Sequence, residues 1–195
     1  TDPFIVINVS DDDALGWAAL TDGSEEVMLS TAAGQTIRFA EEEVRPMGLP
    51  AGGVYGIKLA DDADGLIGMD LATAGDFVWS ITDDGLAKAT PLDEYPTQGR
   101  YGQGVINVRL PKGSEEIAAV VVGDEKTQII VKTALGSAKK LRLNKTYTGS
   151  RAIKPREIFK VSKRNRIVGA LRTTIRPQID EEDEAEPEQL SLLSE

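Results

Sequence analysis

Two basic positions recur in this chain at a spacing of 51 residues: Lys139 follows Lys88, and Arg151 follows Arg100. Ammonium and guanidinium groups neutralise phosphates, and binding of this kind is driven by counterion release without reading base sequence. Cations that recur once per structural unit can follow a bent polyanion and offset the energy of bending it. The spacing therefore predicts a surface track of cations along which a stiff polyanion such as DNA can lie.

The densest basic segment runs from residue 132 to residue 176, where fourteen Lys and Arg residues accompany one acid, Glu157. On an extended strand Lys140 and Arg142 share one face while Leu141 takes the other, so the charges can stay in solvent. A polyanionic partner is the favoured interpretation. The alternative is a basic face that pairs with acidic parts of the same chain, since residues 1–110 carry a net charge of −13. The expected DNA contacts in this segment are Lys139, Lys140, Arg142, Lys145, Arg151, Lys154 and Arg156.

Other chemistry is excluded by the residue types that are missing. The 195 residues include no His and no Cys, which rules out a Ser-His-Asp triad, a thiol nucleophile, a zinc site built on those ligands and a disulfide framework. We assign no catalytic residue, no metal site and no cofactor to this chain. The longest apolar run, 117–122, is far shorter than the roughly 20 residues of a membrane-spanning helix, and the N-terminus lacks the order of a signal peptide. We therefore expect no membrane contact and a cytoplasmic location.

The same spacing extends over most of the chain. The segment Thr31–Gly34 is matched by Thr82–Gly85 and by Thr133–Gly136, each 51 residues further on. The predicted repeats lie at about 10–60, 61–111 and 112–162, with a partial repeat at each end, and they form one repeat domain over residues 1–179. Residues 180–195 hold eight acids and no basic residue, which predicts a disordered acidic tail.

Each repeat is expected to form four β-strands, because its apolar residues alternate or come in short runs bounded by turn residues. In the second repeat the strands are predicted at 66–71, 77–82, 86–90 and 105–110. Asp84-Gly85 predicts a hairpin turn, since glycine accepts the positive φ of a tight turn. Residues 4–8 align with the last strand of a repeat. Residues 166–171 align with the first strand of a further repeat, with Val168 in the position of Ile117.

A period of about fifty residues with four strands is typical of a propeller blade, whose sheet is buried only when neighbouring blades stack on it. The predicted fold class is therefore all-β: a β-propeller-like array of four-stranded blades, with about three full blades plus partial ones and a disordered acidic tail. Because both ends of the array fall in the middle of a repeat, we expect the chain to be a fragment or an incomplete gene product.

Three segments carry a resemblance to a known family: Ile37–Gly48, Gly53–Leu59 and Ala87–Val105. They resemble repeats of the C-terminal domain of the DNA gyrase A subunit, of the type IIA topoisomerases, and the resemblance covers about residues 5–172. It implies a β-pinwheel, which is a propeller variant with strands exchanged between blades. It also implies wrapping of double-stranded DNA around a basic outer rim, in support of ATP-dependent negative supercoiling by the bacterial holoenzyme.

The resemblance further implies partners and cofactors that act through regions outside this chain. These are the gyrase B subunit, the A-subunit dimer, ATP and Mg²⁺, and the implied location is the bacterial cytoplasm in association with the nucleoid. The family's gyrase A-box is a Gln-Arg-Arg-Gly-Gly-Lys-Gly loop. Its nearest match here is 98–104, which lacks one Arg and the Lys of the box. By resemblance, the matching residues Gln98, Arg100, Gly102 and Gly104 join Lys88 as expected DNA contacts.

Two alternatives to a gyrase domain stay open at this point. The first is the related C-terminal domain of a topoisomerase IV A subunit. The second is a non-catalytic propeller that recruits a protein, whose binding would depend only weakly on salt, whereas binding to DNA phosphates weakens steeply as salt rises. No tyrosine of the chain stands in a context that matches the DNA-cleaving tyrosine of the family, so the chain itself is expected to be inert.

Overall fold

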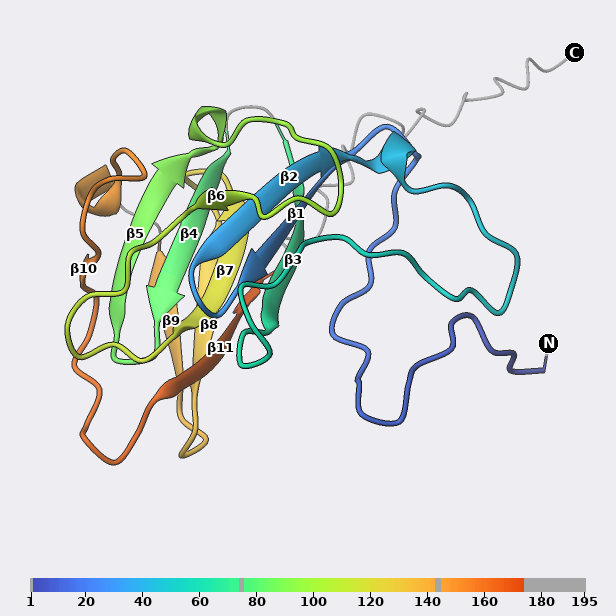
Figure 1. Cartoon of the computed structure of the whole chain (residues 1–195). Helices are drawn as coiled ribbons and strands as arrows, with labels where there is room; N and C mark the ends of the chain where they lie inside the picture. Colours follow the sequence, from blue (N-terminus) through green and yellow to red (C-terminus); the bar gives the residue numbers. More distant parts are fainter. Residues whose placement is uncertain (1, 74–75, 143–144, 174–195) are drawn as a thin grey trace, which may run out of the picture.

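The computed structural model describes residues 2–73, 76–142 and 145–173, and its regular structure consists of short β-strands and single 3-10 turns (Figure 1). The strands are β1 (Glu26–Thr31), β2 (Gln35–Ala40), β3 (Leu66–Ala72), β4 (Phe77–Thr82), β5 (Leu86–Pro91), β6 (Val105–Ile106), β7 (Ile117–Gly123), β8 (Gln128–Thr133), β9 (Ala138–Arg142), β10 (Arg156–Glu157) and β11 (Ile167–Arg172). The 3-10 turns are η1 (Glu41–Glu43), η2 (Leu92–Glu94) and η3 (Lys145–Tyr147). Within these ranges no helix has the length and apolar character needed to cross a membrane.

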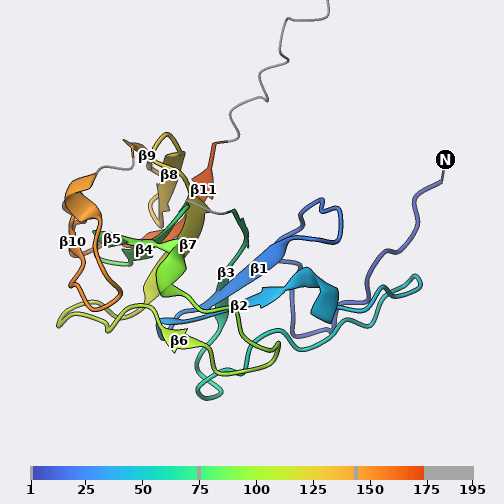
Figure 2. The same cartoon turned by 90° about the horizontal axis from the view of Figure 1, so that it is seen from above.

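Three antiparallel sheets are built by exchange of strands between consecutive repeats. Their strand orders are β3-β1-β2-β6, β10-β5-β4-β7 and β11-β8-β9. In each sheet the central hairpin comes from one repeat, whereas the strands that flank it come from the repeat that follows. We call them the first, second and third sheets; Figure 2 shows them following one another through the molecule. The all-β, propeller-like prediction and its exchanged strands are confirmed, with three strands in the third sheet among the described residues.

The hairpin turns lie where the sequence predicts them. Gly34, Gly85 and Gly136 occupy equivalent turn positions with φ of +91°, +96° and +84°. Glycine is needed at Gly85 for a second reason, because a Cβ there would lie 2.4 Å from the carbonyl oxygen of Phe159. The turn therefore presents a flat backbone surface on which the last segment of the next repeat can lie.

The predicted strand 105–110 is shorter than expected, because only its first two residues belong to β6. The backbone N–H groups of Asn107 and Val108 both donate to the carbonyl oxygen of Gly34, at 2.9 and 3.2 Å. A turn carbonyl thus replaces the strand ladder beyond Ile106. The segment lies against the turn of the first hairpin without forming a strand there.

Residues 4–8, predicted as a last strand, form only an isolated parallel bridge between Ile7 and Ala51. In the later repeats the corresponding strands, β6 and β10, add to the hairpin of the preceding repeat. Residues 4–8 pair with no hairpin in the part of the chain that the structure describes, and Phe4 and Ile5 are exposed. The strand prediction is therefore wrong for this segment.

The alignment of Val168 with Ile117 is also wrong by one residue. Thr82 pairs with Ile117, but the equivalent Thr133 pairs with Ile167. Ile167 is fully buried, whereas Val168 is 46% exposed. Up to residue 158 the 51-residue register holds, since Ile158 donates to Gly85 as Asn107 does to Gly34. Relative to the 51-residue spacing, one residue is therefore missing from the link between residue 158 and β11.

Apolar contacts between successive sheets form the core. Between the first and second sheets lie Met28, Ala72, Val78, Leu92, Tyr95 and Val122. Between the second and third sheets lie Trp79, Ile81, Ala87, Ala89, Ala119, Val121, Ile129, Val131 and Ile167. A smaller cluster of Leu29, Ile37, Phe39 and Ile57 covers the other face of the first sheet. This stacking fixes which side chains of each strand can reach solvent. The predicted tail 180–195 lies outside the described residues.

Candidate nucleic-acid interface

The two recurring arginines make the same internal contacts in successive repeats. The backbone N–H of Arg100 donates to Glu43 Oε2 at 2.6 Å, and its guanidinium donates to the carbonyl oxygen of Tyr55. The backbone N–H of Arg151 donates to Glu94 Oε2 at 3.3 Å. The Arg151 guanidinium donates to the carbonyl oxygen of Ile106 at 3.3 Å and lies 3.9 Å from Glu94 Oε2.

Both arginines therefore reach back by identical intervals, 57 residues to a glutamate and 45 residues to a carbonyl. These contacts tie each connecting loop to the repeat before it. The 51-residue recurrence of Arg100 and Arg151 has a structural cause, because the guanidinium groups hold neighbouring repeats together. Contact of either arginine with DNA stays a prediction.

Lys88 does not lie on an exposed rim, which corrects the expectation from sequence. Its residue surface is 1% exposed, and its ammonium Nζ donates to the carbonyl oxygen of Arg151 at 2.5 Å. Burial, reinforced by the charge of Arg151 and opposed by Glu94, lowers the pKa of the Lys88 ammonium from 10.5 to about 8. The cause is strand exchange, because the loop of the third repeat that leads to β10 meets Lys88 at Arg151, while β10 itself pairs with β5.

Lys139 occupies the same repeat position as Lys88 but is exposed. Among the described strands none covers the edge of β9, the outer strand of the third sheet. The Lys139 ammonium instead lies over the ring of Phe159, 4.4 Å from its centroid, in a cation–π contact. The same position in the repeat is therefore internal in one sheet and open to a ligand in the next.

The alternation predicted for β9 is confirmed. Lys140 and Arg142 are exposed, and Leu141 between them is half-buried and packs against the core between the second and third sheets. Lys140 lies opposite Ile130 on β8, and both belong to the face of the third sheet that is open to solvent. These charges are available to an external partner without being buried.

The loop that resembles the gyrase A-box is bound to the first repeat through its backbone. The Gln98 N–H donates to the carbonyl oxygen of Arg38 at 2.8 Å, and the carbonyl oxygen of Gly102 accepts from the Lys58 N–H at 2.9 Å. Gly104 has φ +70°, and a Cβ there would lie 2.4 Å from the carbonyl oxygen of Thr36. Gln98, Gly102 and Gly104 thus have roles in loop geometry, and their contact with DNA stays a prediction.

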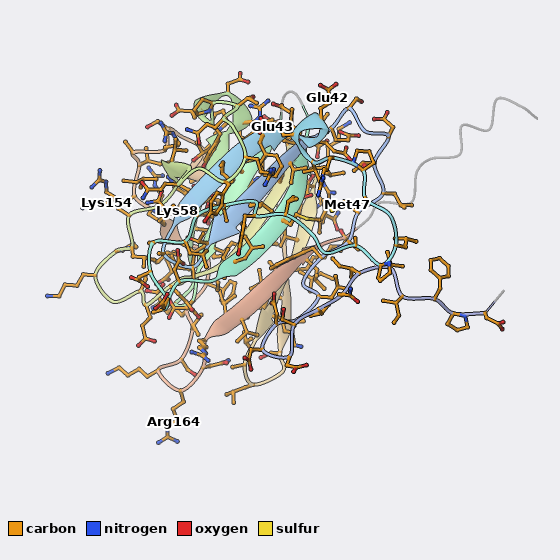
Figure 3. All side chains as sticks on the ribbon, turned by 45° about the vertical axis from the view of Figure 1, so that its right-hand side comes forward. Glu42, Glu43, Met47, Lys58, Lys154 and Arg164 are labelled. Carbon is orange, nitrogen blue, oxygen red and sulfur yellow. The ribbon has the colours of Figure 1, made fainter. Side chains whose placement is uncertain are left out.

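Basic side chains of the third repeat extend from its connecting loop. Lys154 is exposed, and Figure 3 shows its side chain pointing away from the ribbon. Arg156 is exposed and donates from Nη1 to the carbonyl oxygen of Thr146 at 3.0 Å. The side chain of Lys145 lies outside the described residues. Of the cations predicted to bind DNA, the exposed ones are therefore Lys139, Lys140, Arg142, Lys154 and Arg156.

The structure also reveals basic residues that the sequence reasoning did not select. Arg109 and Lys112 are exposed and line a groove of about 730 Å³ together with Lys154, Arg151 and Glu94. The signal that could have found Arg109 is its own recurrence, since Lys58 and Lys160 lie 51 residues on either side of it. No group of acidic residues in the described ranges converges as a metal site.

Comparison with known proteins places this geometry among DNA topoisomerase domains. The family described as DNA gyrase C-terminal domain, beta-propeller, matches residues 25–73 and 77–124. The chain is 35% identical over 181 residues to the DNA gyrase A subunit of Salmonella typhimurium, covering 93% of this chain and 20% of that protein. It is 33% identical over 185 residues to the DNA gyrase A subunit of Pseudomonas aeruginosa, covering 95% and 20%. The chain thus spans about a fifth of the length of these relatives.

Solved structures show the same arrangement of sheets. The C-terminal domain of DNA topoisomerase IV superposes with a TM-score of 0.79 at 25% identity, covering 86% of this chain and 52% of that one. The E. coli ParC C-terminal domain superposes with a TM-score of 0.63 at 15% identity, covering 86% and 68%, which is a likeness of fold.

Proposed function

This chain belongs to the DNA gyrase C-terminal domain family, and from that premise we propose that it binds double-stranded DNA through the phosphates and holds it bent against its outer surface. One observation carries the proposal: between residues 132 and 173 the third repeat and the strand after it display many exposed cations and a single acid, Glu157. The exposed cations of this region are Lys132, Lys139, Lys140, Arg142, Lys154, Arg156, Lys160, Lys163, Arg164, Arg166 and Arg172.

Such a surface attracts a polyanion despite the net charge of −10 of the whole chain. Most of the acids belong to residues 1–110 and 180–195, and one of them, Asp70, forms an ion pair with Arg172 at 3.4 Å. The other exposed cations of the region attract a polyanion over a Debye length of about 8–10 Å. Each phosphate that a cation neutralises releases condensed counterions, which favours binding at low salt. Bending energy is offset when such contacts accumulate along the path of the DNA.

The proposal extends to the protein of which such domains are part in the relatives. There the domain would support ATP-dependent negative supercoiling by a topoisomerase, together with an A-subunit dimer and a gyrase B subunit. ATP and Mg²⁺ would act in those other regions, and the site of action would be the bacterial cytoplasm at the nucleoid. Family membership supports these expectations, and the present chain would contribute the DNA-binding surface.

A salt-titrated binding assay tests the proposal directly. We expect the 195-residue chain to bind two DNA duplexes of unrelated sequence with equal affinity, and the logarithm of the association constant to fall linearly with that of salt. A variant carrying Lys139→Gln, Lys140→Gln and Arg142→Gln should bind more weakly and with a shallower slope. Binding that does not depend on salt would instead favour a protein-recruiting propeller.

Bending of the DNA by the chain is tested by a topological measurement. Closed circular plasmid relaxed in the presence of the chain should show a change in linking number of constant sign that grows with chain concentration. The triple glutamine variant is the matched control, because it retains the fold-determining Leu141. Tight binding without any change in linking number would reduce the proposal from wrapping to simple adhesion.

A topoisomerase IV A subunit is a second candidate source for the domain, and the TM-score of 0.79 with a topoisomerase IV domain favours considering it. The two are distinguished by grafting this chain in place of the C-terminal domain of the gyrase A protein. If the hybrid restores negative supercoiling, a gyrase role is supported. If the hybrid only relaxes DNA, the topoisomerase IV role is supported.

A further inference from the structure

One basic residue stands at the end of every repeat. Lys58, Arg109 and Lys160 are separated by 51 residues, and all three are exposed. None of their side chains forms an ion pair or hydrogen bond with another described residue. They differ in this from Lys88, Arg100 and Arg151, whose side chains are used in contacts between repeats. The cations free for an outside ligand therefore recur at a different position from the one first predicted.

The backbone holds two of these positions in the same local geometry. Asn107, two residues before Arg109, donates its N–H to the carbonyl oxygen of the turn glycine Gly34 at 2.9 Å. Ile158, two residues before Lys160, donates to the equivalent Gly85 at 3.0 Å. A Cβ on either glycine would lie within 2.4 Å of the carbonyl oxygen that precedes the basic residue. The backbone next to each cation thus lies in contact with the hairpin turn of the preceding repeat.

The residue before each cation faces inward, which directs the cation outward. Ile57 and Val108 are 9% and 2% exposed, and Phe159 packs against the core between the second and third sheets. The direction of Arg109 and Lys160 is therefore set by burial of their neighbours, and both lie on the side of the sheets where the hairpins turn.

At Arg109 the surface is hollowed into the groove of about 730 Å³ between the segment 105–112 and the segment 150–154. Lys112 and Lys154 also line this groove, and Lys154 extends into solvent (Figure 3). The one acid among the lining residues, Glu94, is engaged by the backbone N–H of Arg151 and lies 3.9 Å from its guanidinium. Three cations whose side chains have no partner among the described residues thus face one cavity.

We propose that Lys58, Arg109 and Lys160 form a track of phosphate contacts, one per repeat, and that the groove at Arg109 binds the DNA backbone most strongly. The inference rests on the proposed function and specifies which side of the sheets the DNA follows. The three positions contribute unequally. Lys160 lies near Lys163 and Arg164, whereas Lys58 precedes Asp61, Asp62 and Asp64, whose charges oppose a phosphate.

The test compares two double variants of the full chain that lose the same charge. The track variant carries Arg109→Ala and Lys160→Ala. The control carries Arg45→Ala and Lys126→Ala, which remove two cations that are also exposed but lie away from the track. Affinity for a duplex of about 40 base pairs is measured at several salt concentrations. Far-UV circular dichroism and thermal melting establish that each variant is folded.

We expect the track variant to lose about tenfold or more in affinity near 0.1 M salt and its salt slope to fall by about 1.8, because each phosphate contact contributes about 0.9. The control should stay within about twofold. Lys112→Ala with Lys154→Ala is a second variant, confined to exposed side chains, and should weaken binding in the same direction. Lys58→Ala alone should have a smaller effect than Arg109→Ala alone.

The outcomes separate this inference from the function on which it rests. If the wild-type chain binds DNA in a salt-dependent manner and both the track and groove variants match the control, the track is overturned and the proposed function stands. If the wild-type chain shows no salt-dependent binding to DNA, the proposed function is overturned, and the track with it.

Discussion

The ammonium group of Lys88 donates a hydrogen bond to the backbone carbonyl oxygen of Arg151, 63 residues further along the chain. The contact joins the second hairpin to the loop that leads to β10, so it forms only when strands have been exchanged between repeats. Arg151 in turn reaches back to Glu94 and to the carbonyl oxygen of Ile106. Lys88, which the sequence predicts to be a surface cation, is therefore part of the junction between repeats.

Burial of Lys88 predicts that stability rises with pH above neutrality. The pKa of this ammonium is about 8 in the folded chain, against 10.5 for an ordinary lysine. Between these values the unfolded chain binds more protons than the folded chain, so the free energy of unfolding increases as pH rises from about 8 towards 10.5. Below pH 8 the group is charged in both states and the full cost of its burial is present.

The measurement is urea unfolding of the wild-type chain and of Lys88→Met between pH 7 and pH 10. The free energy of unfolding of the wild type, minus that of the variant, should rise by up to about 3 kcal/mol across this range, since one pKa unit corresponds to about 1.4 kcal/mol. Using the difference between the two chains cancels groups that titrate in both. A difference that stays constant with pH would mean that the Lys88 ammonium is solvated.

Lys88 and Lys139 should differ in their effect on DNA binding although they occupy one repeat position. Lys88→Met should leave the affinity within about twofold, because the ammonium is buried and hydrogen-bonded. Lys139→Met should weaken binding severalfold and reduce the salt slope by about 0.9, as expected for loss of one phosphate contact. Anisotropy titration of the two variants against the same duplex measures both quantities. Equal effects would show that exposure does not decide which lysine binds.

The hairpins were predictable from sequence because their causes are local. The strands at 77–82 and 86–90 follow from apolar alternation and a glycine turn, and Lys140 and Arg142 are exposed as the alternation of β9 predicts. Sequence alternation cannot tell which other strand will cover an edge. Lys88 sits in an Ala-Lys-Ala sequence that resembles an exposed strand, yet it is buried, and its ammonium is bonded to the carbonyl oxygen of Arg151, 63 positions later, in the loop that leads to β10.

In the candidate site, too, local features were predictable from the sequence, whereas contacts between repeats were not. Recurrence at 51 residues predicted Arg100 and Arg151 as equivalent DNA contacts, and the structure shows that they make equivalent contacts between repeats. Periodicity alone does not distinguish a contact between repeats from a contact with a ligand. Only the positions of Glu43 and Glu94 decide the matter, and these glutamates recur at the same spacing. The one-residue slip before β11 was likewise invisible, because Val168 and Ile167 are both apolar and only pairing with Thr133 selects between them.

The arginine contacts between repeats predict a selective loss of stability. Glu43→Ala should lower the free energy of unfolding by about 0.5–1 kcal/mol, because it removes an acceptor for the Arg100 backbone N–H at an exposed site. Glu94→Ala should act similarly through Arg151. Glu42→Ala is the control, since Glu42 is an exposed neighbour on the same 3-10 turn (Figure 3). Urea unfolding measures all three, and a loss in Glu42→Ala equal to that in Glu43→Ala would contradict the assignment.

The last prediction concerns Gly104, at the end of the loop that resembles the gyrase A-box. Its φ is +70°, and a Cβ would lie 2.4 Å from the carbonyl oxygen of Thr36, a backbone atom that cannot turn aside. Gly104→Ala should therefore cost both conformational strain and a steric shift, together about 3 kcal/mol of unfolding free energy. Gly113 is the matched control, with φ +109° and nothing within 4 Å of a Cβ, so Gly113→Ala should cost about 1 kcal/mol from strain alone. Equal losses in the two variants would show that the loop at Gly104 can move away from β2, and the role of this glycine would then have to be sought in a ligand.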